Sequence, residues 1–207
     1  MDSALPVAGI VAAYLLGSTP NAWLAGKLLR GIDLREHGSG NLGATNVHRT
    51  LGAPAAVAVL LLDTAKGALP ALWFAQLFRA PSLPWWAIAF GLAAIAGHVR
   101  PYFGLFKGGG KGVATSGGVF AALAPAAFAA GFLVFACTAA VTRYVSLASM
   151  LGGVAIFLAS VSLYGPRSPL TAVSLVIAAF VIWNHRANIG RLRRGEEARL
   201  GQRARPA

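Results

Sequence analysis

The chain has 207 residues, of which 57% are hydrophobic and only 12% charged, and its mean hydropathy is +0.65. Soluble domains contain about 25% charged residues, so this composition excludes an ordinary water-soluble globule and predicts an integral membrane protein. The formal charge is +12, and the basic residues lie between apolar runs rather than on one polar face, which argues against nucleic-acid binding.

The apolar runs predict membrane-spanning helices, because a helix needs about 20 largely apolar residues to cross a bilayer. In chain order the candidate runs are 4–29, 53–77, 85–97, 113–141, 147–163 and 170–183. Polar, glycine-rich segments separate them at 30–52 and 98–112, and an Arg-rich segment follows the last run. The first residues, Met1-Asp2-Ser3, lack the basic start of a signal peptide, so we expect the first run to be kept as a span.

The run 113–141 is ambiguous: it can form one long tilted helix or two short helices that meet near Ala124-Pro125. The positive-inside rule favours two, because only then do both glycine-rich segments and the Arg-rich end share the cytoplasmic side. We therefore predict an all-α integral membrane protein with seven transmembrane helices, some short, an N-terminus outside (periplasmic) and a cytoplasmic C-terminus. Residues 1–207 are expected to form a single membrane-embedded domain, with 191–207 as a basic cytoplasmic tail.

The first polar segment reads Gly38-Ser39-Gly40-Asn41-Leu42-Gly43-Ala44-Thr45-Asn46-Val47-His48-Arg49. Its glycine amides can form an anion-binding nest, and Arg49 can pair with a phosphate through two parallel hydrogen bonds. The match to a G-x-G-x-x-G dinucleotide fingerprint is weak, because that motif requires a preceding strand. The alternative is a flexible interhelical loop. The candidate ligand contacts are Ser39, Asn41, Thr45, Asn46 and Arg49.

The second polar segment runs from His98 to Gly112 and contains Phe106-Lys107-Gly108-Gly109-Gly110-Lys111-Gly112. It is not a P-loop, because Lys111 is followed by glycine rather than Ser or Thr. Two lysines and several free amides before a predicted helix still favour phosphate binding. The alternative is a cationic anchor loop, but anchoring requires charge and not bare backbone.

A third set of polar residues follows the later spans. Ser146 and Ser149 lie about one helical turn apart and can face one pocket, although helix caps or packing residues explain them equally well. His185 and Asn188 share one face of a helix end; a lone histidine there is more often an interfacial residue.

Two charged residues, Asp63 and Lys66, lie inside the apolar run 53–77. Such charges are unfavourable in a bilayer unless they are paired or face a polar cavity. Their i, i+3 spacing allows a mutual ion pair, and we expect the two residues to support the site.

Together the polar segments resemble the acyl-phosphate:glycerol-3-phosphate acyltransferases, the PlsY family. The resemblance rests on Gly-Ser-Gly-Asn-Leu-Gly-Ala-Thr-Asn with Arg49, on the block from His98 to Gly112, and on a closing block. That closing block contains His185, Asn188-Ile189, Arg191-Leu192 and Gly195-Glu196. The resemblance covers nearly the whole chain. One departure is the run of three glycines at 108–110, where the family pattern has two.

The resemblance implies transfer of a fatty acyl group from acyl phosphate to the 1-position of glycerol 3-phosphate. The products are 1-acylglycerol 3-phosphate (lysophosphatidic acid) and phosphate, in the first acylation of phospholipid synthesis, at the cytoplasmic face of a bacterial inner membrane. It implies catalytic roles for Ser39, Arg49, His185 and Asn188, and a structural role for Glu196. The expected substrate contacts are Asn41, Thr45, Asn46, Lys107, Gly108, Gly109, Gly110, Lys111, Gly112 and Ser146.

The expected partners are the two substrates and membrane lipids, without nucleic acid, cofactor or metal, since no carboxylate or imidazole cluster has ligand spacing. Acyl phosphate is a mixed anhydride with a good leaving group, so we expect direct attack by the glycerol hydroxyl without an acyl-enzyme. Arg49 and a lysine would stabilise developing charge, with substrate phosphate or His185 taking the proton.

Other membrane functions fit less well. A transporter of phosphorylated anions would use the same cationic loops but should show internal repeats and polar residues through the midplane. The sequence shows no internal repeat, and its polar segments gather at one face. A purely structural membrane subunit does not need residues 107–112, the glycine–lysine segment. A metal-dependent phosphatidyltransferase is excluded, because Asp2, Asp33 and Asp63 are the only aspartates.

Overall fold

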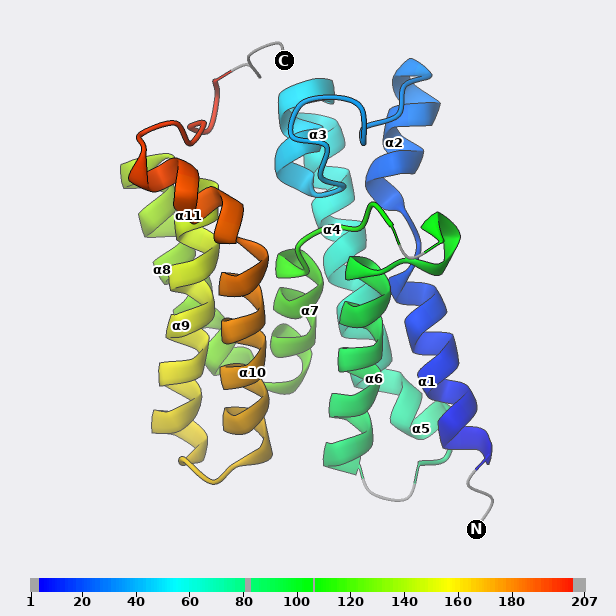
Figure 1. Ribbon diagram of the computed structural model, residues 1–207. Coiled ribbons are helices and arrows are strands. Elements are labelled where there is room, and N and C mark those ends of the chain that lie inside the picture. Colours follow the sequence, from blue (N-terminus) through cyan, green and yellow to red (C-terminus); the bar gives the residue numbers. More distant parts are fainter. Residues whose placement is uncertain (1–3, 81–82, 106, 203–207) are drawn as a thin grey trace. The chain divides into compact units, whose positions relative to one another are not determined.

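The computed structural model describes residues 4–80, 83–105 and 107–202, and this part of the chain contains helices and no strands, as predicted. Phe106 of the second segment, and Arg203 and Arg205 of the predicted tail, lie outside the described residues. In chain order (Figure 1) the elements are α1 (Ala4–Gly17), α2 (Asn21–Arg30), α3 (Ala44–Leu51), α4 (Ala53–Leu69), the π-helix η1 (Pro70–Phe74), α5 (Ala75–Leu77), α6 (Leu83–Val99), the 3₁₀-helix η2 (Tyr102–Gly104), α7 (Val113–Leu123), α8 (Pro125–Thr142), α9 (Val145–Tyr164), α10 (Pro169–Asn184) and α11 (Arg186–Arg193).

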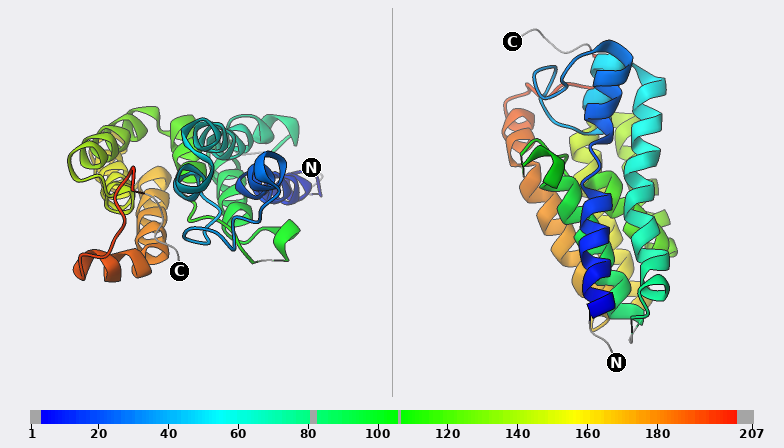
Figure 2. Two further views of the ribbon diagram at one scale, coloured as in Figure 1. Left: turned by 90° about the horizontal axis from the view of Figure 1, so that it is seen from above. Right: turned by 90° about the vertical axis from the view of Figure 1, so that its right-hand side faces the viewer.

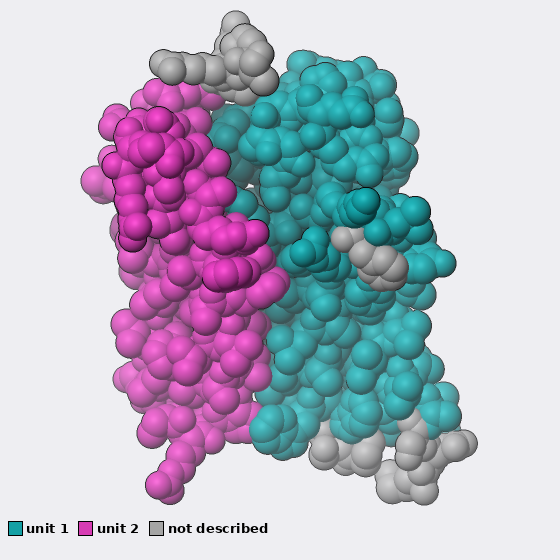
Figure 3. Space-filling view, in the orientation of Figure 1, with its two compact units in different colours: residues 1–123, 203–207 teal, residues 124–202 magenta. Residues whose placement is uncertain are grey.

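The described chain divides into two compact units, coloured teal and magenta in Figure 3. The first runs through α7 and ends at Leu123, and the second covers Ala124–Gln202. In the first unit α1 packs on α6, while α3 and α7 pack on α4 (Figure 2). In the second, α9 packs against both α8 and α10.

Length and composition make this a membrane protein with several candidate spans. Four stretches within the described ranges are long and apolar enough to cross a bilayer: Ala4–Arg30, Ala53–Leu77, Pro125–Thr142 and Val145–Tyr164. The bent pair α10 and α11, which meet at 57°, can supply a fifth. Large apolar side chains point outward, as expected of lipid-facing surfaces, among them Leu61, Trp73, Leu133, Val141 and Val176. The predicted seven spans and the orientation of the termini stay predictions.

The ambiguous run 113–141 forms two helices, which confirms the two-helix interpretation. Ala124 separates them with a φ of −145° and a ψ of 61°, outside the helical region. Pro125 then occupies the first turn of α8, where its missing N–H group leaves no hydrogen bond unmade. At 11 residues α7 is roughly 16 Å long, too short to cross a hydrocarbon core of about 30 Å alone.

The first apolar run is interrupted in a way the sequence analysis did not predict. Helix α1 ends at Gly17 and α2 begins at Asn21, so the segment 18–20 is not helical. Pro20 explains the break, because it has no N–H group and restricts the backbone of Thr19. Ser18 Oγ donates to the Tyr14 carbonyl at 2.8 Å and so closes the end of α1.

Close contact between α4 and α7 depends on glycine. A Cβ atom on Gly67 would collide with the Thr115 carbonyl, and one on Gly118 with the Thr64 carbonyl. The two backbones therefore touch near the start of α7. This contact fixes the glycine–lysine segment, which leads directly into α7, beside the middle of the run 53–77.

Candidate active site

The first polar loop is shaped by the side chain of Asn46, which is only 2% exposed. Its Oδ1 accepts from the Ser39 N–H at 2.9 Å, and its Nδ2 donates to the carbonyls of Leu34 at 3.1 Å and His37 at 3.0 Å. These bonds fold the loop over the start of α3. The carboxamide is therefore largely used by backbone groups, and substrate contact by Asn46 stays a prediction.

Gly38 offers a test of this loop. It has a left-handed φ of +62°, and a Cβ there would collide with Asn46 Oδ1. Gly31 has a similar φ of +68° but open space around its Cβ position, so Gly31→Ala is a matched control for backbone strain alone. We expect Gly38→Ala to lower kcat/KM roughly 100-fold by displacing the loop, and Gly31→Ala to leave it near the native value. Equal losses in the two variants would contradict the proposed importance of loop geometry.

The glycine–lysine segment is held against the end of α6. The Gly110 N–H donates to the His98 carbonyl at 3.2 Å, and the His98 ring lies so close to Gly110 that a Cβ would enter it. Gly108 and Gly112 have left-handed φ values of +71° and +84°. Glycine thus permits both the turn and the close approach, and the segment ends at the N-terminus of α7, a favourable place for an anion.

One hydrogen bond joins the two polar loops. Asn41 Nδ2 donates to the Gly109 carbonyl at 3.4 Å, 68 residues away in sequence. The first unit therefore brings together two segments that the sequence analysis singled out separately.

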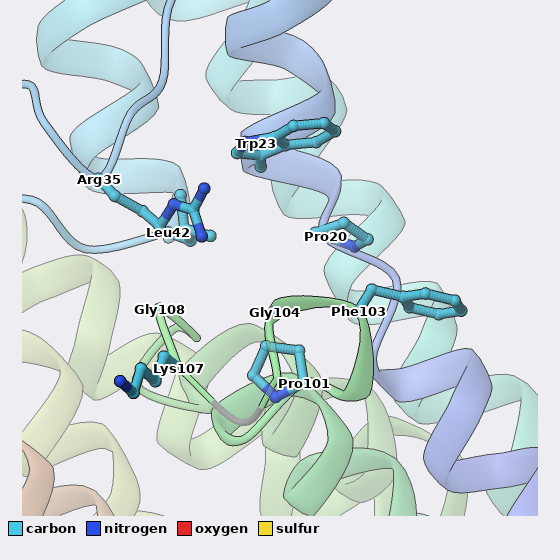
Figure 4. Close-up of a pocket in the computed structure, with 9 residues that line it drawn as sticks. All are labelled: Pro20, Trp23, Arg35, Leu42, Pro101, Phe103, Gly104, Lys107 and Gly108. Atoms are coloured by element: carbon cyan, nitrogen blue, oxygen red, sulfur yellow. The ribbon is translucent and has the colours of Figure 1, made fainter.

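A cavity of about 90 Å³ lies between these loops and the break after α1 (Figure 4). Two cationic side chains, Arg35 from the first loop and Lys107 from the second, border it. The remaining lining residues are Pro20, Trp23, Leu42, Pro101, Phe103, Gly104 and Gly108. The combination of cationic and apolar groups suits an anionic ligand with an apolar part.

Arg35 borders the cavity and was not among the residues predicted from the sequence. Its Nη2 donates to Asp33 Oδ2 at 2.6 Å and its Nε to Asp33 Oδ1 at 3.0 Å, while Trp23 Nε1 also donates to Asp33 at 3.1 Å. The hydrogen bonds from Arg35 hold the pKa of Asp33 well below its usual range. Asp33 in turn raises the pKa of Arg35, so the guanidinium at the cavity edge stays protonated and is ion-paired with the Asp33 carboxylate. The signal in the sequence was the Asp-x-Arg spacing just before Gly38.

The ion pair that the i, i+3 spacing of Asp63 and Lys66 allows is present in the structure. Lys66 Nζ lies 2.9 Å from Asp63 Oδ1, and the two side chains are 5% and 3% exposed. Both belong to α4 in the first unit.

In the second unit, Glu197 is the centre of a polar cluster. Its Oε1 accepts from Ser146 Oγ at 2.7 Å and from Asn188 Nδ2 at 2.6 Å, and its Oε2 accepts from Arg191 Nε at 2.7 Å. Burial raises the pKa of Glu197, but these hydrogen bonds together outweigh it and hold the pKa below its ordinary value. The sequence analysis assigned the structural role to Glu196, whose side chain is 56% exposed and pairs with Arg194. The buried carboxylate belongs to the next residue, Glu197.

His185 lies at the junction of α10 and α11 and is buried. Its Nδ1 is 2.7 Å from the Val181 carbonyl. A carbonyl can only accept, so Nδ1 carries a proton, and in the neutral ring Nε2 is the nitrogen that can take one. Ser149, for which the sequence left a pocket residue and a packing residue open, donates to the Val145 carbonyl of its own helix.

The remaining predicted residues lie in the first unit. Ser39 is exposed on the first loop, and Thr45 and Arg49 are four residues apart on α3 and so share one helix face. Lys107 is exposed, and Lys111 and Gly112 directly precede α7. No group of three or more His, Cys, Asp or Glu side chains in the described ranges can hold a metal ion. The roles of all these residues in binding and catalysis stay predictions.

Comparison with known proteins gives consistent matches over nearly the full length. The model of the family described as "Glycerol-3-phosphate acyltransferase" matches residues 7–195. Curated proteins of that name are similar in sequence. The protein from Bacillus velezensis is 46% identical over 183 residues (88% of this chain and 91% of that protein), and the one from Geotalea daltonii is 47% identical over 189 residues (91% and 94%).

A solved structure is also similar. The crystal structure of PlsY, an integral membrane glycerol 3-phosphate acyltransferase, in its glycerol 3-phosphate form is 41% identical, with a TM-score of 0.82 over 95% of this chain and 96% of that chain. Its lysophosphatidic acid form gives a TM-score of 0.83 at the same identity, over 95% of each chain.

Proposed function

Because the chain belongs to the glycerol-3-phosphate acyltransferase family, we propose that it transfers a fatty acyl group from acyl phosphate to the 1-hydroxyl of glycerol 3-phosphate. The observation that carries this proposal is the contact between Asn41 and Gly109, which joins two cationic, glycine-rich loops. Backbone amides and fixed cations in one place suit a phosphate-bearing substrate. Crystal forms of the similar PlsY with glycerol 3-phosphate and with lysophosphatidic acid support the acceptor and the product.

The proposed reaction is a direct displacement at the acyl carbon. The 1-oxygen of glycerol 3-phosphate bonds to the acyl carbonyl carbon, and the bond from that carbon to the phosphate oxygen breaks. The products are 1-acylglycerol 3-phosphate and inorganic phosphate. Arg49 and a lysine of the second loop stabilise the negative charge that develops on the acyl and phosphate oxygens. Ser39 assists by hydrogen bonding and does not become acylated.

The proton of the attacking hydroxyl needs an acceptor. His185 Nε2 is proposed for this role, because the bond from Nδ1 to the Val181 carbonyl fixes the ring and its tautomer. The leaving phosphate is the alternative acceptor. Asn188, held by Glu197, is proposed to act in the same step by orienting substrate.

An assay of acyl donors tests the function. Purified protein would be incubated with glycerol 3-phosphate and palmitoyl phosphate, palmitoyl-CoA or palmitoyl-acyl carrier protein in turn. We expect lysophosphatidic acid and equimolar phosphate with palmitoyl phosphate only. Product formation with either thioester and none with the acyl phosphate would overturn the proposed donor.

The two lysines of the second loop can be compared by their effect on glycerol 3-phosphate binding. Lys107 borders the cavity beside Arg35, so Lys107→Met is expected to raise the KM for glycerol 3-phosphate about 10- to 100-fold, as for loss of a charge-assisted hydrogen bond. Lys111→Met is expected to raise it less. Lys27, exposed on α2 and not lining the cavity, supplies the control Lys27→Met, which should leave KM unchanged. An unchanged KM in Lys107→Met would exclude Lys107 as the main phosphate contact.

We propose seven spans with the N-terminus periplasmic and both glycine-rich loops cytoplasmic. The proposal rests on the positive-inside distribution of Lys and Arg and on the helix break at Ala124. Single cysteines at exposed positions in a Cys137→Ala background test it by labelling intact cells with a membrane-impermeant maleimide. We expect labelling at Arg167, exposed between α9 and α10, and none at Glu36, exposed in the first loop. The reverse pattern would refute this topology.

A further inference from the structure

A buried polar cluster connects the break after α1 to the glycine–lysine segment, and the proposed mechanism does not use it. Asp63 Oδ1 accepts from Asn21 Nδ2 at 3.0 Å and pairs with Lys66 Nζ at 2.9 Å. Lys66 Nζ also donates to the Thr19 carbonyl at 2.9 Å. Pro20 interrupts the helix here, so Lys66 satisfies a carbonyl beside the break. The ion pair thus links α4 to the segment that borders the cavity.

The same carboxylate also lies near the end of α6. His98 Nδ1 lies 3.7 Å from Asp63 Oδ1, and the His98 side chain is 6% exposed. The ring of His98 covers Gly110, and its carbonyl accepts from the Gly110 N–H at 3.2 Å. A continuous line of contacts therefore runs from Asp63 through His98 to the glycine–lysine segment.

The chemistry of the cluster favours a positional role over a stabilising one. Removing two charges from water is unfavourable, and a buried ion pair often contributes no more stability than apolar residues of the same volume. Apolar residues cannot, however, hold neighbouring helices in a defined arrangement through hydrogen bonds and ion pairs. Asp63 receives groups from α2, α4 and α6 at one oxygen atom.

We infer that Asp63, Lys66 and His98 are positioning residues that set the glycine–lysine segment at the correct distance from the break after α1 for binding the phosphate of glycerol 3-phosphate. This inference rests on the proposed function for its kinetic consequence. The position of the segment itself can be measured without turnover.

The first test replaces the pair by apolar residues of similar size. Asp63→Leu/Lys66→Met leaves no unpaired buried charge, so the chain should still fold. We expect the KM for glycerol 3-phosphate to rise at least about 10-fold, with kcat changed much less, measured with whichever acyl donor supports turnover. Asp63→Asn/Lys66→Met keeps an oxygen acceptor for Asn21 and His98 and should recover part of the KM. Thr64→Val is the matched control, because the Thr64 hydroxyl donates to the Leu60 carbonyl of its own helix and has no other partner among the described residues.

Amide hydrogen exchange supplies a readout that does not depend on activity. Peptides that cover 107–113 should exchange faster in the Leu/Met variant than in the native chain or Thr64→Val, because the bond from Gly110 to His98 opens more often. If the native chain shows no turnover with any donor, the proposed function fails and this measurement alone decides the inference. Unchanged exchange together with an unchanged KM would overturn it.

A compensation test covers the case in which the Leu/Met variant does not fold. Gly110→Ala should raise KM, since the new Cβ collides with the His98 ring. His98→Asn removes the part of the ring that meets Gly110 but keeps an N–H donor near the position of Nδ1. We therefore expect the double variant Gly110→Ala/His98→Asn to bind glycerol 3-phosphate more tightly than Gly110→Ala. If the loss of glycerol 3-phosphate binding in the double variant equals the sum of the losses in the two single variants, Gly110 and His98 are not coupled. That result would overturn the inference.

Discussion

Replacing His185 with asparagine is expected to lower kcat about 10²- to 10⁴-fold, the usual effect of losing a general base. The KM for glycerol 3-phosphate should change little. The reason lies in the two ring nitrogens. Asparagine can still donate to the Val181 carbonyl from a position close to that of Nδ1, so the junction between α10 and α11 is kept. It has no counterpart of Nε2, the nitrogen proposed to take the proton.

The control measurement for His185→Asn is its thermal stability, which shows whether the fold is kept. The apparent melting temperature in detergent should stay within a few degrees of the native value, whereas His185→Ala, which also loses the bond to Val181, should melt lower. A kcat in His185→Asn within about threefold of native, against the 10²-fold or greater loss expected for a general base, would assign proton transfer to the leaving phosphate. His185 would then serve only to hold the junction between α10 and α11 through its bond to Val181.

The second large effect is expected for Glu197. Glu197→Gln places an amide N–H₂ group where Arg191 or Asn188 now donates, so at least one donor loses its acceptor in a buried place. We expect a loss of about 2 to 4 kcal/mol in the free energy of unfolding, because breaking a buried, hydrogen-bonded charge pair leaves its partners unpaired. Activity should fall with it, because the variant keeps one acceptor oxygen for the Ser146, Asn188 and Arg191 donors that the native carboxylate holds with two. Glu196→Gln is the matched control, because the Glu196 side chain is largely exposed and its pair with Arg194 lies at the surface.

The pH dependence of stability provides a second measurement on Glu197. Its pKa is lowered by folding, so its contribution to stability is complete above the ordinary value of 4.5 and is lost as the pH falls through the folded-state pKa. The native chain should therefore lose stability below about pH 4.5 more steeply than Glu197→Gln. Parallel curves for the two chains would mean that another carboxylate controls acid stability.

The sequence predicted the helical class because hydropathy marks apolar helices. It favoured a helix break near Ala124 because only two helices in 113–141 place both glycine-rich segments and the Arg-rich end on one side. The i, i+3 spacing of Asp63 and Lys66 allowed the ion pair that forms between them. The break at 18–20 was missed, although Pro20 marks it, because the hydropathy of the first run continues across it.

Contacts between distant segments could not be predicted in the same way. Nothing in the order Gly195-Glu196-Glu197 tells which carboxylate turns inward, since that depends on where Ser146, 51 residues earlier, comes to lie. The sequence also suggested Asn46 as a ligand residue from its chemistry, whereas its carboxamide mainly binds the backbone of its own loop. Polar residue types identify a candidate site, but tertiary contacts decide which of them face the ligand and which hold the others.

The meeting of α4 and α7 at Gly67 has a consequence for how the two substrates arrive. Gly67 lies 14 residues after Ala53, the first residue of α4, which is about 21 Å along the helix axis. In the proposed topology the start of α4 is cytoplasmic, so the head of α7 opens to the cytoplasm but is recessed from that end of α4. A water-soluble acceptor must then descend to it from the cytoplasm, while a donor with a long acyl tail can enter sideways from the leaflet and keep that tail in lipid throughout.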